Sequence, residues 1–87
     1  MLGLTKSLAR DLGPHNIRVN AIIPGWIMTK RQLDLWLTPE AEANLMQRQC
    51  LKHKLHPADC ARMTLFLASD DASGITSQSF VVDGGRL

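Results

Sequence analysis

The stretch Ile17-Arg-Val-Asn-Ala-Ile-Ile-Pro-Gly25 decides the fold of this chain. Its first seven residues are short, rich in β-branched side chains and bounded by turn residues, which predicts a strand over 17–23. The end of that strand, Ala21-Ile22-Ile23, is continuously apolar. Such a run is typical of a parallel strand that is buried on both faces. Pro24-Gly25 then stops the strand and predicts a loop.

A helix precedes the strand. Leu4, Leu8 and Leu12 recur every four residues, which predicts an amphipathic helix over 2–12 with one apolar stripe. Gly13-Pro14 ends it, because glycine suits the left-handed position after a helix and proline cannot continue one. Nothing caps its start, so we expect it to be the tail of a longer helix.

A second helix and a second strand follow near the carboxyl end. Pro57 at the first helical position and Asp59 in the first turn predict a helix over 57–68. One face of this helix carries Ala61, Leu65 and Ala68. The segment 75–82 predicts a strand, and Asp83-Gly84-Gly85 closes it with a turn.

The intervening residues 26–56 predict helices. Thr38 is a suitable N-cap for Pro39 and an acidic first turn, so we expect a helix from Pro39 to Lys52. Leu33, Trp36 and Leu37 have helical spacing and predict a short helix before it. Both helices would cover another element rather than join a sheet.

The predicted order is helix, strand, helical insert, helix, strand. Two buried strands separated by some fifty residues that contain helices indicate a parallel crossover. Helices on one side of such a pair cannot cover both of its faces. We therefore expect an α/β fold in which this chain forms the last part of a larger sheet.

Composition excludes several classes of protein. The 87 residues carry 10 Lys+Arg and 8 Asp+Glu, 45% are hydrophobic, and the start of the chain has no signal-peptide pattern. No apolar run reaches 18 residues, so we expect no membrane span. The two signs of charge are nearly balanced, so we expect no nucleic-acid partner. With only two cysteines, both expected to be reduced, we expect a cytoplasmic location. The cysteines, Cys50 and Cys60, lack metal or redox spacing, and we expect half-buried packing roles for both. We expect the three histidines to lie at the surface and to form no metal site.

Four segments, taken together, resemble the short-chain dehydrogenase/reductase family. They are Gly3-Leu-Thr-Lys-Ser-Leu-Ala9, the stretch 16–25 with Thr29, the Pro57-Ala-Asp59 helix ending in Phe66-Leu-Ala-Ser69, and Val81-Val-Asp-Gly-Gly85. Within the family, the variable insert is most similar to bacterial sugar 1-dehydrogenases of the D-xylose type. The similar residues there are Trp26-Ile-Met-Thr29, Leu35-Trp-Leu37 and Gln49-Cys50.

The resemblance implies the carboxyl-terminal part of a Rossmann-type, doubly wound parallel sheet. Residues 1–12 would end the active-site helix, 17–29 form a strand and cofactor loop, 30–56 a substrate lid, and 57–85 the last helix and strand. The activity implied is hydride transfer between NAD or NADP and an alcohol or carbonyl carbon, with an aldose as substrate. The family also implies homo-oligomers in the full-length form.

The family places cofactor-binding residues in the loop after the first strand. Pro24, Gly25, Ile27 and Thr29 occupy those positions, and the Ile27 amide would meet the nicotinamide carboxamide. From the residues alone, a plain strand-terminating turn is the favoured interpretation, and the resemblance reverses that preference. The insert residues Gln32, Asn44 and Gln49 either bind a polyol or face solvent. Asn20, inside an apolar strand, predicts a structural hydrogen bonder between loops.

The family's proton-transfer pair, Tyr-x-x-x-Lys, would align just before residue 1, and the chain contains no tyrosine. No G-x-G-x-x-G phosphate loop is present either. We therefore assign no catalytic residue and expect the 87-residue chain alone to be inactive. The alternative is a non-catalytic truncated remnant or a small structural or interaction module. Ser77 departs from the family, since a glycine is common at this position.

Overall fold

The computed structural model of the protein describes residues 2–28 and 38–86. Its longer elements are α1 (Leu2–Leu12), β1 (Ala21–Pro24), α3 (Pro39–Arg48), α4 (Pro57–Ala68) and β2 (Ser79–Val82). Short 3-10 helices cover Gly13–His15 and Asp70–Ala72. The short helix predicted around Leu33, Trp36 and Leu37 lies outside the described residues.

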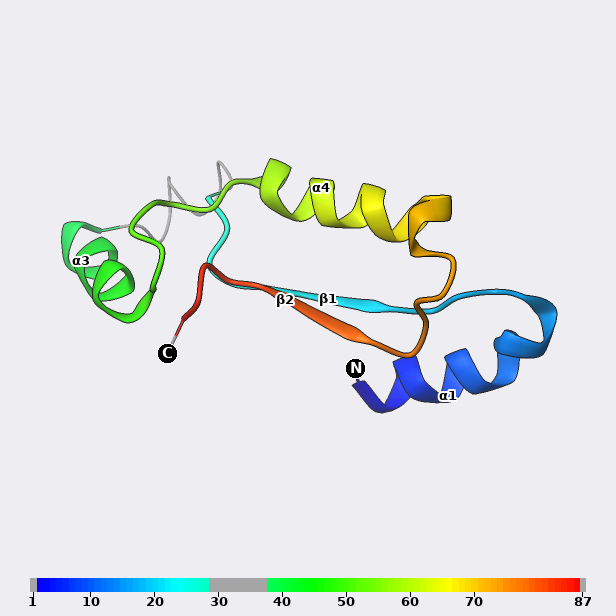
Figure 1. Cartoon of the computed structure of the whole chain (residues 1–87). Helices are drawn as coiled ribbons and strands as arrows, with labels where there is room; N and C mark the ends of the chain where they lie inside the picture. The colour runs from blue at the N-terminus through cyan, green and yellow to red at the C-terminus, as the bar shows by residue number, and fades with distance from the viewer. Residues whose placement is uncertain (1, 29–37, 87) are drawn as a thin grey trace.

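The two strands form a parallel pair, as predicted. Ala21 lies opposite Ser79, and Pro24 opposite Val82. In Figure 1 both strands run toward α3, so their carboxyl ends share one edge. The pairing of distant strands confirms the α/β prediction. Because each strand has only one described neighbour, neither is fully buried, and Val81 of β2 is exposed.

Both strands are shorter than the sequence predicts, since side chains replace ladder bonds at their amino ends. The Val19 amide donates to the Thr76 hydroxyl over 3.1 Å. The Asn20 side chain donates to the Ile75 carbonyl (3.0 Å) and accepts from the Gln78 amide (3.1 Å). The structural role predicted for Asn20 is therefore confirmed.

Helix α1 has the predicted bounds but buries a different face. Thr5 and Ala9 are its buried residues, whereas Leu4 is 61% exposed and Leu8 is also exposed. Periodicity locates an apolar stripe but does not say which side a neighbour covers. Within the described part of the chain, nothing buries Leu4 and Leu8.

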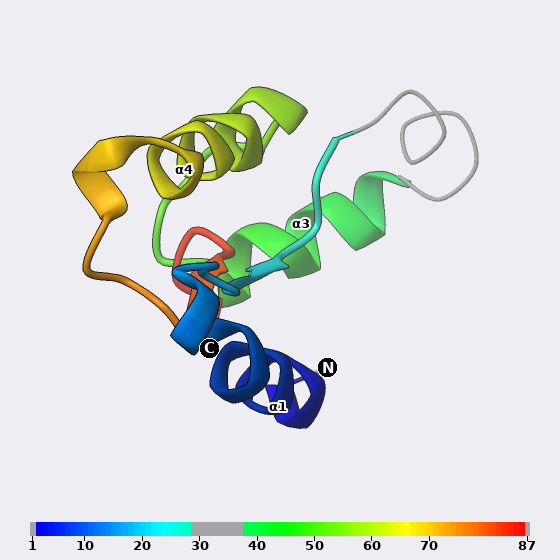
Figure 2. The same ribbon diagram turned by 90° about the vertical axis from the view of Figure 1, so that its right-hand side faces the viewer.

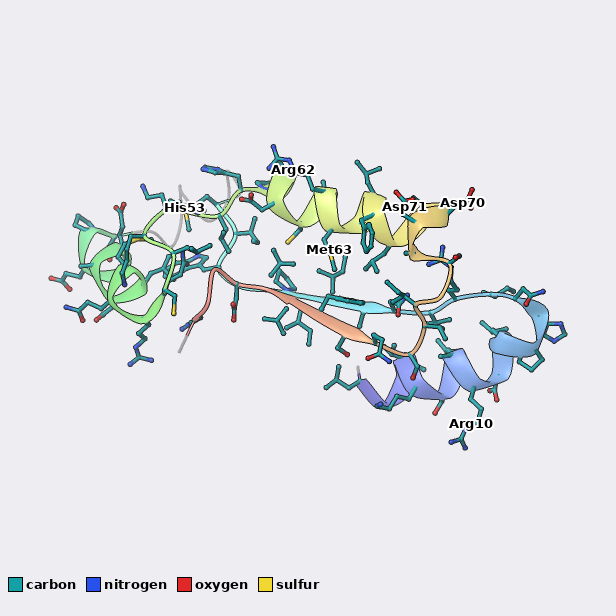
Figure 3. All side chains as sticks on the ribbon, in the orientation of Figure 1. Arg10, His53, Arg62, Met63, Asp70 and Asp71 are labelled. Carbon is teal, nitrogen blue, oxygen red and sulfur yellow. The ribbon has the colours of Figure 1, made fainter. Side chains whose placement is uncertain are left out.

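Helix α4 also has the predicted bounds, and its inward face again differs from the prediction. Leu65 is 70% exposed, and Ala61 and Ala68 are exposed as well. Figure 3 shows Met63 pointing from α4 toward the strands and Arg62 pointing away. The Arg18 guanidinium donates to the Leu67 carbonyl over 2.6 Å, which ties the end of α4 to the chain before β1.

Helix α3 begins as predicted, because the Thr38 hydroxyl accepts from the Ala41 amide over 3.1 Å. It ends at Arg48 rather than Lys52. Gln49 leaves the helical conformation with φ −93° and ψ 130°, and it forms an antiparallel bridge with Arg86. This pairing with the end of the chain replaces the last predicted helical turn.

The described residues form an elongated layer structure. Figures 1 and 2 place α1 and α4 on opposite sides of the strand pair, which corrects the expectation of helices on one side. The molecule measures 49 × 24 × 23 Å, and its radius of gyration is 15.6 Å. A compact chain of this length would have a radius of about 12 Å. No helix in the described ranges is long and apolar enough to cross a membrane.

Candidate functional site

Residues 24–28, which we call the rim loop, comprise the last residue of β1 and the loop that follows it, and they lie at the shared carboxyl edge of the strands. The strand thus includes Pro24, one residue further than the sequence predicts. Ligands of open parallel α/β sheets bind at this edge. The Gly25 amide donates to the Val82 carbonyl over 2.9 Å, so the parallel ladder continues one residue beyond β1. This bond fixes where the rim loop leaves the sheet.

Gly25 is packed directly against the end of β2. A Cβ atom at this position would lie 2.7 Å from both Cα and Cβ of Asp83. Any larger residue would force the rim loop and β2 apart. The glycine therefore serves the close approach of two backbones, a reason that the sequence alone did not reveal.

The far end of the rim loop is held by Leu55. Ile27 and Leu55 form an isolated parallel bridge, and the Met28 amide donates to the Leu55 carbonyl over 2.7 Å. Met28 and Leu55 are each 4% exposed and belong to the small core. Among the described residues, the Ile27 amide donates no hydrogen bond, although both Gly25 and Met28 use theirs.

Gln49 is the most completely buried large side chain in the described ranges, with 1% of its surface exposed. Its Nε2 atom donates to the carbonyls of Leu51 and His53, each over 2.6 Å. These bonds hold the turn that leads from α3 to Leu55. One alternative for this residue, that it faces solvent, is therefore wrong.

The two glycines after β2 make room for the end of α3. Gly84 and Gly85 have φ values of 67° and 78°, and Cβ atoms there would lie 2.7 Å from Gln49 and 2.8 Å from Cys50. The amides of Cys50 and Leu51 donate to the carbonyls of Gly85 and Gly84, each over 2.9 Å. The predicted structural role of these glycines is confirmed. Cys50 itself is exposed, not half-buried.

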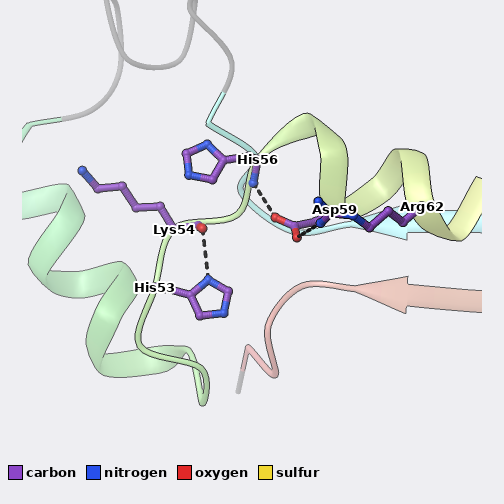
Figure 4. Close-up of polar contacts among 5 residues, drawn as sticks. All are labelled: His53, Lys54, His56, Asp59 and Arg62. Carbon is purple, nitrogen blue, oxygen red and sulfur yellow. Dashed lines mark hydrogen bonds and ion pairs between the residues drawn. The ribbon is translucent and has the colours of Figure 1, made fainter.

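The charged and imidazole groups beside the rim loop stabilise local structure. Figure 4 shows the Asp59 carboxylate accepting from the His56 amide (2.7 Å) and meeting Arg62 at 3.5 Å. The His53 ring contacts the Lys54 carbonyl over 3.1 Å. All three histidines are exposed, as predicted. The described residues contain no group of three potential metal ligands.

The structure thus brings Pro24, Gly25 and Ile27 together at the carboxyl edge, while Thr29 lies outside the described residues. Sequence reasoning missed Leu55 and Asp83 as the groups that hold this loop. A single apolar residue within the polar stretch 52–56 was the available signal for Leu55. For Asp83 no signal exists, because its contact with Gly25 depends on the strand pairing.

The rim loop, with its close-packed Pro-Gly turn and available amide, therefore lies at the edge where open parallel α/β sheets bind their ligands. A family model described as enoyl-(acyl carrier protein) reductase matches residues 1–86. The chain belongs to the short-chain dehydrogenase/reductase family, and its fold is part of the Rossmann type.

Individual relatives show the same likeness. The chain is 55% identical over 85 residues to a probable galactose dehydrogenase of Rhizobium meliloti, covering 98% of this chain and 33% of the relative. It is 49% identical over 83 residues to a D-xylose 1-dehydrogenase of Caulobacter vibrioides, covering 95% of this chain and 33% of that relative. The solved structure of 4-hydroxyisoleucine dehydrogenase complexed with NADH matches with a TM-score of 0.90 and 37% identity, over 97% of this chain and 35% of that one. The chain spans about a third of the length of the curated relatives it matches.

Proposed function

We propose that this chain forms the nicotinamide end of the cofactor site, and the lid over the substrate, of an NAD(P)-dependent sugar dehydrogenase. The observation that carries the proposal is the Ile27 amide. It lies at the carboxyl edge of the sheet with no acceptor among the described residues, between two amides that are already bonded. An amide in that position fits the carboxamide oxygen of a nicotinamide.

The contacts that hold both ends of the rim loop support this role. Gly25 keeps the loop within van der Waals contact of Asp83, and Leu55 fixes its far end. Ile27 would hold the carboxamide through its backbone, and we propose that the Thr29 hydroxyl binds in the same region. When bound, NAD(P) supplies the atom that accepts or donates hydride.

Sugar as the substrate class is supported by the two relatives that are named as galactose and D-xylose dehydrogenases. We assign the lid to residues 30–56, of which α3 lies beyond the carboxyl ends of the strands (Figure 1). We also propose a homo-oligomer, because Leu65, Phe66 and Val81 present exposed apolar side chains on α4 and β2.

The direct test joins residues 1–86 to the remaining two thirds of the Rhizobium meliloti galactose dehydrogenase, in place of its matching segment; we call this protein the joined enzyme. We expect the joined enzyme to reduce NAD or NADP with D-galactose or D-xylose. The 87-residue chain alone, which lacks tyrosine, is expected to show no reduction above a buffer blank. A joined enzyme that melts cooperatively but turns over no sugar would instead favour the non-catalytic structural module.

The Ile27 amide is tested by deleting it. Ile27→Pro removes the donor, whereas Ile27→Val keeps it and changes the side chain only slightly. In the joined enzyme, Ile27→Pro should raise the KM for the cofactor about tenfold, the equivalent of one hydrogen bond of about 1.4 kcal/mol. Ile27→Val should leave the KM for the cofactor within about twofold of the parent value. Equal KM values for both variants would contradict the assignment.

A further inference from the structure

The Gln49 side chain lies between two parts of the molecule that are distant in sequence, the segment that follows α3 and the turn after β2. It follows the last residue of α3, its Cδ would be 2.7 Å from a Cβ on Gly84 after β2, and its Nε2 holds the carbonyls of Leu51 and His53. A buried polar side chain in such a place must keep its hydrogen bonds, because unpaired carbonyls near the core are costly.

From Gln49 the connection to the rim loop is short and passes through one segment. His53, whose carbonyl Gln49 holds, is two residues before Leu55. Leu55 in turn bridges to Ile27 and accepts from the Met28 amide. The orientation of the Ile27–Met28 backbone therefore depends on where the 51–55 segment lies. Gln49 holds that segment, together with the Leu51 amide, which donates to the Gly84 carbonyl, and the Lys54–Glu42 ion pair.

The carbonyl oxygens of Leu51 and His53 face Nε2, so this position requires a side chain that donates hydrogen bonds. A carboxylate of the same shape would place a negative oxygen about 2.6 Å from two carbonyl oxygens. On the other side of the group, Oε1 is buried and accepts no hydrogen bond within the described part of the chain. Exchanging the positions of Nε2 and Oε1 by rotating the amide offers no alternative arrangement, because Oε1 would then face the carbonyl oxygens of Leu51 and His53.

We propose that Gln49 is a positioning residue for the cofactor edge: its buried amide holds the 51–55 segment and thereby keeps the Ile27 amide aimed at the nicotinamide. This role rests on the proposed function of the rim loop. It acts through backbone geometry, since no contact between Gln49 and the cofactor is required.

The experiment compares Gln49→Glu with Gln47→Glu in the joined enzyme. Both variants exchange an amide for a carboxylate on the same helix end, but Gln47 is exposed. Gln49→Glu should raise the KM for NAD(P) about tenfold near pH 8 while kcat changes by less than about twofold. Gln47→Glu should leave the KM for NAD(P) within about twofold of the parent value, because Gln47 does not contact the 51–55 segment through any hydrogen bond within the described residues. A loss of folded protein with an unchanged KM would overturn the proposal, because it would show a structural role only.

The pH profile gives a second readout. Burial and the two facing carbonyl oxygens disfavour the charged form of the introduced carboxyl, whereas Lys52, whose Nζ donates to the Gln49 backbone carbonyl over 2.6 Å, favours it. Because Lys52 is exposed and screened by solvent, we expect burial to dominate and the pKa of the carboxyl to be raised. Once protonated it can donate to one of these carbonyls, so the KM defect should shrink as the pH falls toward about 5 and reappear as the pH rises. A KM ratio between Gln49→Glu and the parent that is constant with pH would contradict this mechanism.

Hydrogen exchange separates this inference from the proposed function. In Gln49→Glu without cofactor, the Met28 amide, bonded to Leu55, should exchange at least about tenfold faster, whereas the Gly25 amide, bonded to Val82, should keep its rate. If the joined enzyme shows no turnover yet gives this pattern, the proposed function fails, and Gln49 is shown to hold the rim loop but not to position a cofactor. Unchanged exchange at Met28 would overturn the positioning role even in an active enzyme.

Discussion

Ser77 has a left-handed backbone, with φ of 63°, because the chain must turn there to enter β2. Its amide donates to the Val19 carbonyl over 2.8 Å, which fixes this conformation. A left-handed conformation costs a residue with a Cβ atom about 1–2 kcal/mol, and glycine avoids that cost. Serine at this position, where the sequence comparison with the family expects a glycine, is therefore a source of local backbone strain.

Ser77→Gly should stabilise the joined enzyme by about 0.5–1 kcal/mol, measured as the free energy of unfolding in a urea titration. Ser73→Gly is the matched control, since Ser73 has φ of −60° and gains nothing from glycine. The control should be neutral or destabilising, because glycine increases the entropy of the unfolded chain. Equal effects of the two substitutions would contradict the strain at Ser77.

At the scale of the elements, the contact of Gly25 with Asp83 decides how closely the rim loop follows β2. Gly25→Ala places a methyl group 2.7 Å from the Asp83 backbone. Overpacking of this kind costs about 1–3 kcal/mol. The substitution should lower the unfolding free energy of the joined enzyme by that amount and raise the KM for the cofactor, because the Ile27 amide moves with the loop.

The matched control for Gly25→Ala is Gly3→Ala. A Cβ on Gly3 would meet no atom within 4 Å, and Gly3 lies inside α1. Alanine is the better helix former, so this change should stabilise by up to about 1 kcal/mol. If Gly25→Ala lowered the unfolding free energy no more than Gly3→Ala does, the proposed close packing of the rim loop against Asp83 would be wrong.

The positions of the elements were largely predictable, whereas the lengths of the two strands and of α3 were not. The bounds of α1 and α4 follow from apolar periodicity and from the proline and glycine signals at their ends. The end of α3 was misplaced by four residues because Gln49 pairs with Arg86, which is distant in sequence. Local propensity contains no information on such a partner.

At the scale of the whole molecule, few side chains are buried. The buried apolar residues of the described ranges are Ala9, Met28, Leu45, Leu55 and Ala72. Large apolar side chains on α1, α4 and β2 remain exposed, and the radius of gyration exceeds that of a compact chain by more than 3 Å. So small a core cannot offset the conformational entropy that folding removes.

We therefore expect the isolated 87-residue chain to show no cooperative transition in scanning calorimetry. A compact domain of this length would unfold with an enthalpy of about 60 kcal/mol near 60 °C. The joined enzyme, as the comparison, should melt cooperatively because its remaining part covers the exposed apolar faces. A sharp transition of that size in the isolated chain would indicate an independent small module instead.

The sequence by itself determined the element types, their order, the parallel pairing and the location of the candidate cofactor loop. Local periodicity and turn chemistry are sufficient for the element types, their order and the loop that ends the first strand, because these depend on residues that are neighbours along the chain. The parallel pairing followed instead from the long, helix-containing connection between the two strands. Only the tertiary structure decided which helix faces are covered, why Gly25 must lack a side chain, and that Gln49 is buried. Those properties arise where segments some thirty to sixty residues apart come into contact, and hydrogen bonding and packing at such contacts depend on distances that a linear pattern does not encode.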